Sequence, residues 1–77
     1  MITLGQSIKQ HRETRGLTQA QLAERSGLTI THLQKIEAGK RPGITLYTLA
    51  RIAQGLTITP AELLTDVVII EPRAVKQ

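Results

Sequence analysis

The sequence from residue 16 to residue 39 reads GLTQAQLAERSGLTITHLQKIEAG, and this stretch decides the fold. It holds two short segments with helical spacing of apolar residues, separated only by Gly27-Leu28-Thr29. A connection that short, with a glycine in it, favours a steep crossing of two helices over an antiparallel hairpin. We therefore expect two crossed helices, with the small Ala23 near their closest approach. The corner between them is expected to be filled by Leu22, Leu28, Leu33 and Ile36.

The same helix-start signal recurs along the chain. Threonine is a preferred N-cap residue because its hydroxyl accepts a hydrogen bond from a backbone amide of the first helical turn. An apolar residue just before the cap and another four residues after it form a hydrophobic staple. Four threonines have both apolar neighbours, and for two of them Gln21 or Glu62 completes a capping box. These four caps are Thr18, Thr29, Thr45 and Thr59.

Glycines are expected to end the helices, since glycine adopts the left-handed conformation that commonly follows a helix. The first helix has a less clear start, for which Thr3 is the candidate cap, and Pro60 suits the first position of the last helix. The pattern predicts an all-α fold followed by a short strand or extended arm. The expected stops are Gly16, Gly27, Gly39 and Gly55, and the expected helices span residues 4–15, 19–26, 30–38, 46–54 and 60–65.

The composition is that of one small domain. Of the 77 residues 40% are hydrophobic, but Tyr47 is the only aromatic residue, so Leu, Ile and Val must form the core. The absence of cysteine excludes disulfides and Cys-ligated zinc. The longest purely apolar run, residues 67–70, is far too short to span a bilayer. With no signal-peptide pattern at the N-terminus, we expect a cytoplasmic protein that does not engage a membrane.

The positive charge is concentrated in the first half of the chain. The formal net charge is +4; residues 1–41 contain seven basic and three acidic residues, whereas residues 42–77 contain three of each. An electropositive half beside a neutral half suggests a polyanionic partner on one side of the protein. A charged face kept for solubility is the alternative interpretation of this charge balance. The segment 30–38 is more informative, because slim polar donors without carboxylates suit a helix that enters the major groove of DNA. Opposite Leu33 and Ile36, its outer face carries Thr31, Gln34, Lys35 and Ala38, with Ile30 at the edge.

Four motifs together resemble the Cro/cI-type (XRE) helix-turn-helix domains of phage repressors and bacterial regulators. GLTQAQLA at residues 16–23 is similar to the opening of their second helix, and IEAGKRP at 36–42 to the end of their recognition helix. LARIA at 49–53 and PAELL at 60–64 are similar to their last two helices. The resemblance covers residues 4–65 and implies a five-helix lambda-repressor-like domain, which we expect to occupy residues 1–65.

The resemblance also implies a DNA-contacting role for individual residues. Lys35 is expected to donate to guanine, Gln34 to pair with adenine and Ile30 to touch a thymine methyl. Packing within the protein is the alternative role of Ile30. The expected base contacts are Thr29, Ile30, Thr31, Gln34 and Lys35. The expected phosphate contacts, which hold register without reading sequence, are Arg12, Gln19, Lys40 and Arg41, the last two being solvated loop residues in the alternative interpretation.

By the same resemblance, Arg12 and Glu37 form a structural ion pair between the first and third helices. Such a pair would explain how a carboxylate is tolerated so near DNA. Nothing in the sequence indicates catalysis, because His11 and His32 lack partners at ligand or triad spacing. We therefore expect no enzyme activity, no metal and no cofactor.

Residues 66–77 form the expected C-terminal arm. Four β-branched residues in a row predict a strand, and the expected all-α domain offers no other strand to pair with it. An isolated strand gains little in water, so pairing with the same strand of a second chain is one interpretation. Folding back onto the last helices, or disorder, is the other. The expected dimerisation residues are Val67, Val68, Ile69 and Ile70.

The function expected from these features is sequence-specific transcription regulation. The protein would bind double-stranded DNA as a homodimer at a pseudo-palindromic operator, as a repressor, and associate with the nucleoid when bound. The alternative is an antitoxin or adaptor whose C-terminal arm binds a protein partner.

Overall fold

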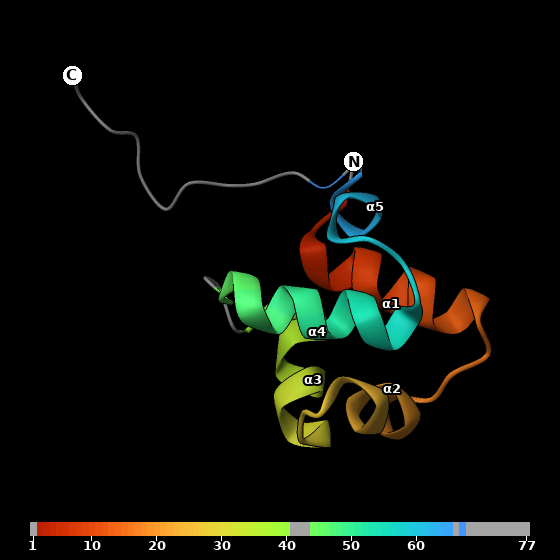
Figure 1. The fold of residues 1–77 in the computed structure, drawn as a ribbon. Coiled ribbons are helices and arrows are strands. Elements are labelled where there is room, and N and C mark those ends of the chain that lie inside the picture. The colour runs from red at the N-terminus through yellow and green to blue at the C-terminus, as the bar shows by residue number, and fades with distance from the viewer. Residues whose placement is uncertain (1, 41–43, 66, 68–77) are drawn as a thin grey trace.

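The computed structural model describes residues 2–40, 44–65 and 67 and has five helices arranged around one core (Figure 1). The expected all-α fold is confirmed. Each expected helix is present, and the bounds differ from the prediction by two residues at most. The helices are α1 (Leu4–Thr14), α2 (Gln19–Ser26), α3 (Ile30–Glu37), α4 (Leu46–Leu56) and α5 (Pro60–Leu64).

Every helix begins directly after a threonine. The side chain of each cap accepts a hydrogen bond from the backbone amide three residues further on, which satisfies one amide that has no partner within the helix. The capping boxes expected at Thr18 and Thr59 are present, and Thr3 makes a third one with Gln6. The local start signal therefore predicted four helix N-termini, and the candidate cap Thr3 predicted the fifth.

The first four helices share one kind of C-terminus, in which the two backbone amides after the last turn bond back to carbonyls of that turn. Gly16, Gly27 and Gly39 adopt the left-handed conformation there, as expected. The prediction that Gly55 ends α4 is wrong. Gly55 lies inside the helix, and the left-handed residue is Thr57, with φ of 61° and ψ of 42°. A β-branched residue is rare in this conformation.

Gly55 has a packing role instead of a turn role. It is buried against α2, where a Cβ atom would lie 2.5 Å from the Ser26 hydroxyl oxygen and 3.2 Å from Leu22 Cδ1. The absence of a side chain lets α4 approach α2 closely, and this requirement comes from a residue 29 positions away in sequence. It could not be recognised from the local helix-end pattern.

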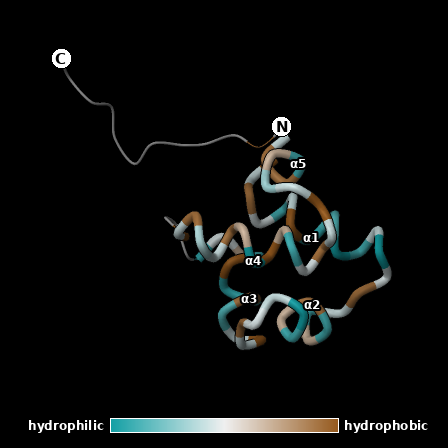
Figure 2. The backbone as a smooth tube through the Cα atoms, in the orientation of Figure 1, coloured by the Kyte–Doolittle hydropathy of each residue, from teal (hydrophilic) through white to brown (hydrophobic). Residues whose placement is uncertain are grey.

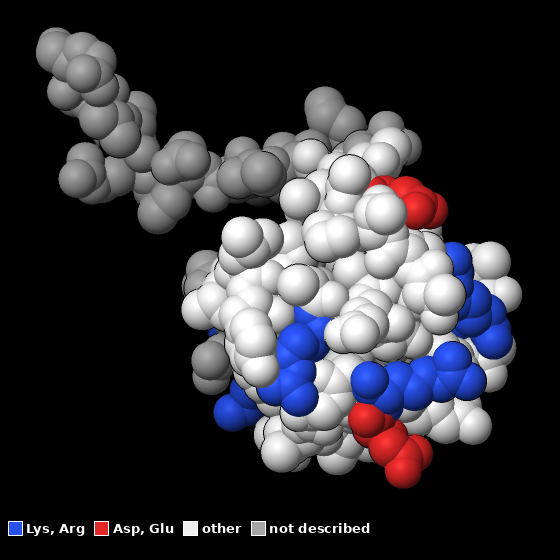
Figure 3. Space-filling model, viewed as in Figure 1, with Lys and Arg blue, Asp and Glu red and all other residues white. Residues whose placement is uncertain are grey.

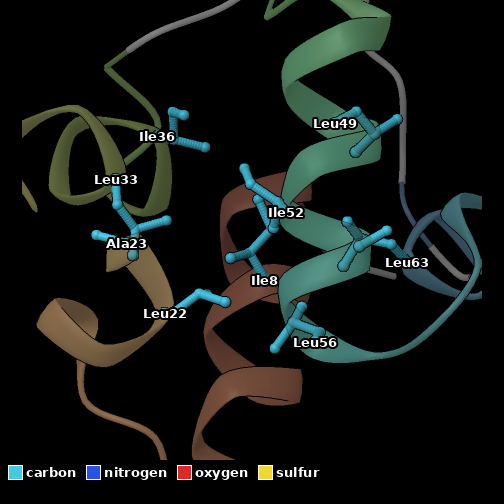
Figure 4. Close-up of a cluster of buried hydrophobic side chains, with 10 residues drawn as sticks. Ile8, Leu22, Ala23, Leu33, Ile36, Leu49, Ile52, Leu56 and Leu63 are labelled. Atoms are coloured by element: carbon cyan, nitrogen blue, oxygen red, sulfur yellow. The ribbon is translucent and has the colours of Figure 1, made fainter. Parts of the chain in front are cut away.

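One hydrophobic core joins the five helices. Hydrophobic and hydrophilic stretches alternate along the chain (Figure 2), and the hydrophobic side chains of all five helices meet between α4 and the other helices (Figure 4). Ala23 is buried at the crossing of α2 and α3, as expected, and Leu28 packs against the cluster from the turn. The core residues are Ile8, Leu22, Ala23, Leu33, Ile36, Leu49, Ile52, Ala53, Leu56 and Leu63.

The two ends of the described chain meet beside α1 and α5. Ile2 and Val67 form an isolated parallel β-bridge. The expectation that the domain offers no strand partner to the arm is therefore wrong at Val67, because the residue before the Thr3 cap is already extended. Residues 68–77 of the expected arm, including Val68, Ile69 and Ile70, lie outside the described residues.

Candidate nucleic-acid interface

Helix α3 has one buried and one exposed face. Leu33 and Ile36 are turned into the core and are at most 3% exposed. Thr31, Gln34 and Lys35 lie on the opposite face and are exposed. The phase expected from the sequence is therefore correct, and it leaves a hydroxyl, an amide and an ammonium group at the surface, with no carboxylate among them. Such groups can donate to base edges in a major groove.

The start of α3 adds two further exposed residues to this face. Ile30 is 41% exposed, so it presents apolar surface to solvent as well as to its neighbours. Thr29 is exposed too, but its hydroxyl oxygen accepts a hydrogen bond from the His32 amide at 3.1 Å. Thr29 therefore caps the helix in the free protein and keeps only its hydroxyl hydrogen and one lone pair for another partner. All five expected base-contacting residues share the exposed side of this helix and its cap.

The expected ion pair between α1 and α3 is present. Arg12 Nε donates to Glu37 Oε2 at 2.8 Å and Arg12 Nη2 donates to Glu37 Oε1 at 3.1 Å, a two-pronged arrangement. The side chains are only 10% and 4% exposed. The third contact of Arg12 is Nη1 to the Leu17 carbonyl at 2.8 Å. Arg12 is thus largely occupied by the protein itself, so its expected role at a phosphate would have to use its remaining N–H groups.

The Glu37 carboxylate has another partner that the sequence did not reveal. Gln19, at the first position of α2, donates from Nε2 to Glu37 Oε1 at 3.0 Å. Gln34 of α3 in turn donates from Nε2 to Gln19 Oε1 at 3.4 Å. A continuous set of hydrogen bonds therefore runs from the buried guanidinium of Arg12 to the exposed face of α3. We call the four residues Arg12, Glu37, Gln19 and Gln34 the polar relay.

A glycine on α1 makes room for this arrangement. Gly5 is buried against the end of α3, and a Cβ there would lie 2.6 Å from the carbonyl oxygens of both Ile36 and Glu37. The close approach brings α1 alongside the backbone of Glu37 and so supports the ion pair. In the sequence Gly5 looks only like an ordinary residue of a helix start.

The C-terminal end of α2 is held by a residue that sequence reasoning also missed. Arg51 of α4 donates from Nε to the Ser26 carbonyl at 2.9 Å and from Nη2 to the Gly27 carbonyl at 3.3 Å. Its guanidinium lies 5.2 Å from the centre of the Tyr47 ring, and Nη1 bonds the Tyr47 hydroxyl at 3.2 Å. Arg51 thereby satisfies two carbonyls at the helix end and places a positive charge where the helix dipole favours one.

The remaining expected phosphate contacts lie at the surface or beyond the described residues. Lys40 is exposed just after α3, and its backbone amide bonds the Lys35 carbonyl at 2.9 Å, which fixes the start of the loop. Arg41 lies outside the described residues. In Figure 3 basic side chains are scattered over the lower part of the molecule and its right-hand edge, where α2, α3, α4 and the end of α1 lie, and acidic ones occupy two small areas. Most of this face is uncharged, and the charged side chains on it are mostly basic.

Within residues 2–40, 44–65 and 67, no three His, Asp or Glu side chains gather closely enough to hold a metal ion. No helix in this part of the chain is long and apolar enough to cross a bilayer.

Comparison with known proteins gives concordant results. A helix-turn-helix family model (HTH_3) matches residues 8–63. The chain is 36% identical over 62 residues to y4dJ, an uncharacterized HTH-type transcriptional regulator of Sinorhizobium fredii, over 80% of this chain and 79% of that one. The restriction-modification controller protein C.AhdI of Aeromonas hydrophila has a TM-score of 0.75 at 35% identity, over 78% and 89% of the two chains. SinR, a master regulator for biofilm formation solved with DNA, has a TM-score of 0.76 at 29% identity, over 80% and 98%.

Proposed function

The chain belongs to the HTH_3 helix-turn-helix family, whose members are DNA-binding transcription regulators of the XRE type and not enzymes, and from this premise we propose that it represses transcription as a homodimer on a pseudo-palindromic operator. The observation that carries the proposal is the outer face of α3, where exposed Thr31, Gln34 and Lys35 meet no exposed carboxylate. The one acidic side chain of the helix, Glu37, is buried in its ion pair.

In the proposed complex α3 lies in the major groove and its exposed residues read bases. Lys35 donates to guanine and Gln34 to adenine, while Ile30 contacts a thymine methyl group, and Thr29 and Thr31 flank them. Each well-formed contact contributes about 1–3 kcal/mol of discrimination against a wrong base. The exposure of all five residues supports this assignment.

The phosphates on either side of the groove are proposed to be held by Gln19, Arg12, Lys40 and Arg41. Gln19 occupies the first position of α2, where backbone amides without helical partners favour an anion. Lys40 follows α3 directly and acts through its charge. These contacts set the orientation of the domain but carry no sequence information.

A second copy of the chain is proposed to pair through residues 67–70. Two domains related by a two-fold axis would place two recognition helices about 34 Å apart, one DNA turn, and account for a palindromic site. Val67 already has an extended backbone, bridged to Ile2 on one side. Deleting residues 66–77 and measuring mass by sedimentation equilibrium tests the arm, because a truncated chain that still dimerises contradicts it.

The proposal is tested by selecting bound duplexes from a random-sequence DNA pool and measuring affinity at two salt concentrations. A two-fold symmetric consensus is expected for the wild type, with a preference for guanine lost in Lys35→Ala. Lys9→Ala, which removes an exposed lysine of α1, is the matched control and should keep the preference. Uniform binding with a steep salt dependence, and no consensus, would contradict the proposal and favour an arm that binds a protein partner.

A further inference from the structure

Ile30 is an apolar residue on a face that is otherwise polar. It occupies the first position of α3 and is 41% exposed. The other exposed residues of this face, Thr31, Gln34 and Lys35, present a hydroxyl, an amide and an ammonium group. A single exposed apolar residue is ordinary on most of a protein surface. This one lies among the residues proposed to read bases, so it would face the floor of the groove in the proposed complex.

Core packing does not account for Ile30 in the part of the chain that the structure describes. Leu28, two residues earlier, is half-buried and packs against the core. Leu33, three residues later, is completely buried. Ile30 belongs neither to the core nor to the partly buried residues that pack on it. The start of α3 is therefore anchored by its neighbours, and a large part of the Ile30 side chain remains accessible to a partner.

An isoleucine side chain has neither a donor nor an acceptor, which limits the base edges that it can face. Most groups on the floor of the major groove are hydrogen-bond donors or acceptors, and an apolar side chain would remove their water without replacing it. The apolar substituent in the groove is the methyl group on C5 of thymine. 5-Methylcytosine carries the same methyl group on the same ring carbon, in a pair with guanine. Ile30 is thus suited to contact the methyl group, whichever of the two pyrimidines bears it.

We infer that Ile30 makes DNA binding depend on a C5-methylated pyrimidine, so that methylation of a cytosine at the contacted position strengthens binding. This inference rests on the proposed function and adds a regulatory input to it, a covalent modification of the DNA. Thymine and 5-methylcytosine both satisfy the contact, whereas uracil and unmodified cytosine do not.

The size of the effect follows from the area of one methyl group. Transferring one such group from water to an apolar environment contributes about four-fold to an equilibrium constant. Ile30 covers the methyl group from one side only, so about three-fold is expected for each half-site. A two-fold symmetric operator presents the contact twice, and changing both half-sites together should alter the affinity about ten-fold.

The first arm of the experiment removes the methyl group from thymine. The full chain is titrated by fluorescence anisotropy against the consensus duplex selected by the wild type. In further duplexes deoxyuridine replaces thymidine at one position of each half-site at a time, which deletes the methyl group and keeps the pairing. One replacement should weaken wild-type binding about ten-fold. The same replacement should have no effect on Ile30→Ala, and this result identifies the contacted position.

The second arm adds the methyl group to cytosine at that position. Two duplexes carry a C·G pair there in both half-sites, one with cytosine and the other with 5-methylcytosine. The wild type should bind the methylated duplex about ten-fold more tightly, and Ile30→Ala should bind the two equally. Because the two duplexes differ only by the methyl groups, contacts of other residues to the pair cancel in the ratio.

Two control variants separate the methyl contact from folding and from general apolar contact. Ile30→Val keeps a branched apolar side chain and should retain most of both ratios. Leu46→Ala removes a leucine of α4 that is 75% exposed and should leave both ratios as in the wild type. Thermal melts of Ile30→Ala should agree with the wild type within a few degrees, since Ile30 lies outside the core.

Each outcome supports or overturns the inference. If no uracil replacement weakens wild-type binding, no thymine methyl group is read and the inference is wrong while the proposed function stands. If the replacement weakens Ile30→Ala as much as the wild type, another residue reads the methyl group. If 5-methylcytosine binds no better than cytosine, binding does not respond to methylation. If the wild type selects no consensus, the proposed function fails and the inference with it.

Discussion

The two ends of α2 are held in opposite ways. At the N-terminal end a carboxylate from α3, Glu37, accepts a hydrogen bond from the side chain of Gln19 at 3.0 Å. At the C-terminal end a guanidinium from α4, Arg51, donates to the backbone carbonyls of Ser26 and Gly27 at 2.9 and 3.3 Å. One end is thus fixed through a side chain and the other through the backbone.

The two ends of this eight-residue helix therefore have different roles: the N-terminal end serves DNA recognition and the C-terminal end serves the stability of the fold. The N-terminal end keeps unused hydrogen-bonding atoms on Gln19 and leads to the exposed face of α3. The C-terminal end is closed, because Gly55 of α4 packs directly on Ser26 and Leu22 and leaves no space for a side chain. We therefore expect changes at the C-terminal end to alter folding and changes at the N-terminal end to alter DNA binding, except at the buried anchor Glu37.

The largest effect is expected from Glu37→Ala. The substitution leaves the Arg12 guanidinium buried without its anion, and breaking a buried pair in this way costs about 3 kcal/mol or more. The free energy of unfolding, measured by urea denaturation with circular dichroism, should fall by that amount, and the melting temperature should fall by several degrees or more. The paired replacement Arg12→Met with Glu37→Leu removes both charges and should recover much of the loss. An unchanged melt in Glu37→Ala would refute the pairing.

Gly55→Ala should destabilise the opposite end of α2. The added methyl group meets the Ser26 hydroxyl and Leu22 inside the α2–α4 contact, and overpacking of this kind costs about 1–3 kcal/mol. The gain in helix propensity from glycine to alanine, about 1 kcal/mol, offsets part of it. A net loss of about 1 kcal/mol in urea denaturation is expected, and Gln54→Ala at the neighbouring exposed position should show none. A more stable Gly55→Ala protein would contradict the close packing.

Arg51→Ala should cost about 1 kcal/mol of stability, since two carbonyls at the end of α2 lose their charged partner. The affinity for the selected consensus duplex should change no more than in Arg25→Ala, which removes an exposed arginine of α2 and the same amount of charge. A loss of base preference in Arg51→Ala, comparable to that in Lys35→Ala, would break the proposed division between the two ends.

The smallest effect is expected from Ser26→Ala. The Ser26 hydroxyl is buried and has no hydrogen-bond partner among the described residues, so removing it deletes an unsatisfied polar group. Calorimetry should show a melting temperature equal to or slightly above that of the wild type. A clear fall in melting temperature would show that the hydroxyl has a partner, such as a buried water molecule.

The same comparison shows what the sequence could reveal. Helix starts were predictable because a cap threonine and its neighbours lie within five residues, and α3 was phased correctly from the positions of Leu33 and Ile36. The ion pair between Arg12 and Glu37 was accessible through resemblance to a family. These features depend on short-range patterns or on motifs already associated with a fold.

The missed features depend on residues that are distant in sequence. Nothing near Gly55 indicates that it packs on Ser26 and that Thr57, not glycine, takes the left-handed position. The contact of Arg51 with the end of α2 and the hydrogen bond from Gln19 to Glu37 likewise appear only when the helices are packed. The bridge between Ile2 and Val67 joins the two ends of the described chain, and no sequence pattern near either residue indicates it.

The most direct test of the division between the two ends of α2 is an NMR titration of the ¹⁵N-labelled protein with the selected consensus duplex. The side-chain amide signals of Gln19 and Gln34 and the Nε signal of Arg51 report on the two ends in one spectrum. We predict large shifts for both glutamine amides and little change at Arg51. Shifts at Arg51 with unchanged glutamine signals would contradict the account, because DNA would then contact the end of α2 that we assign to stability.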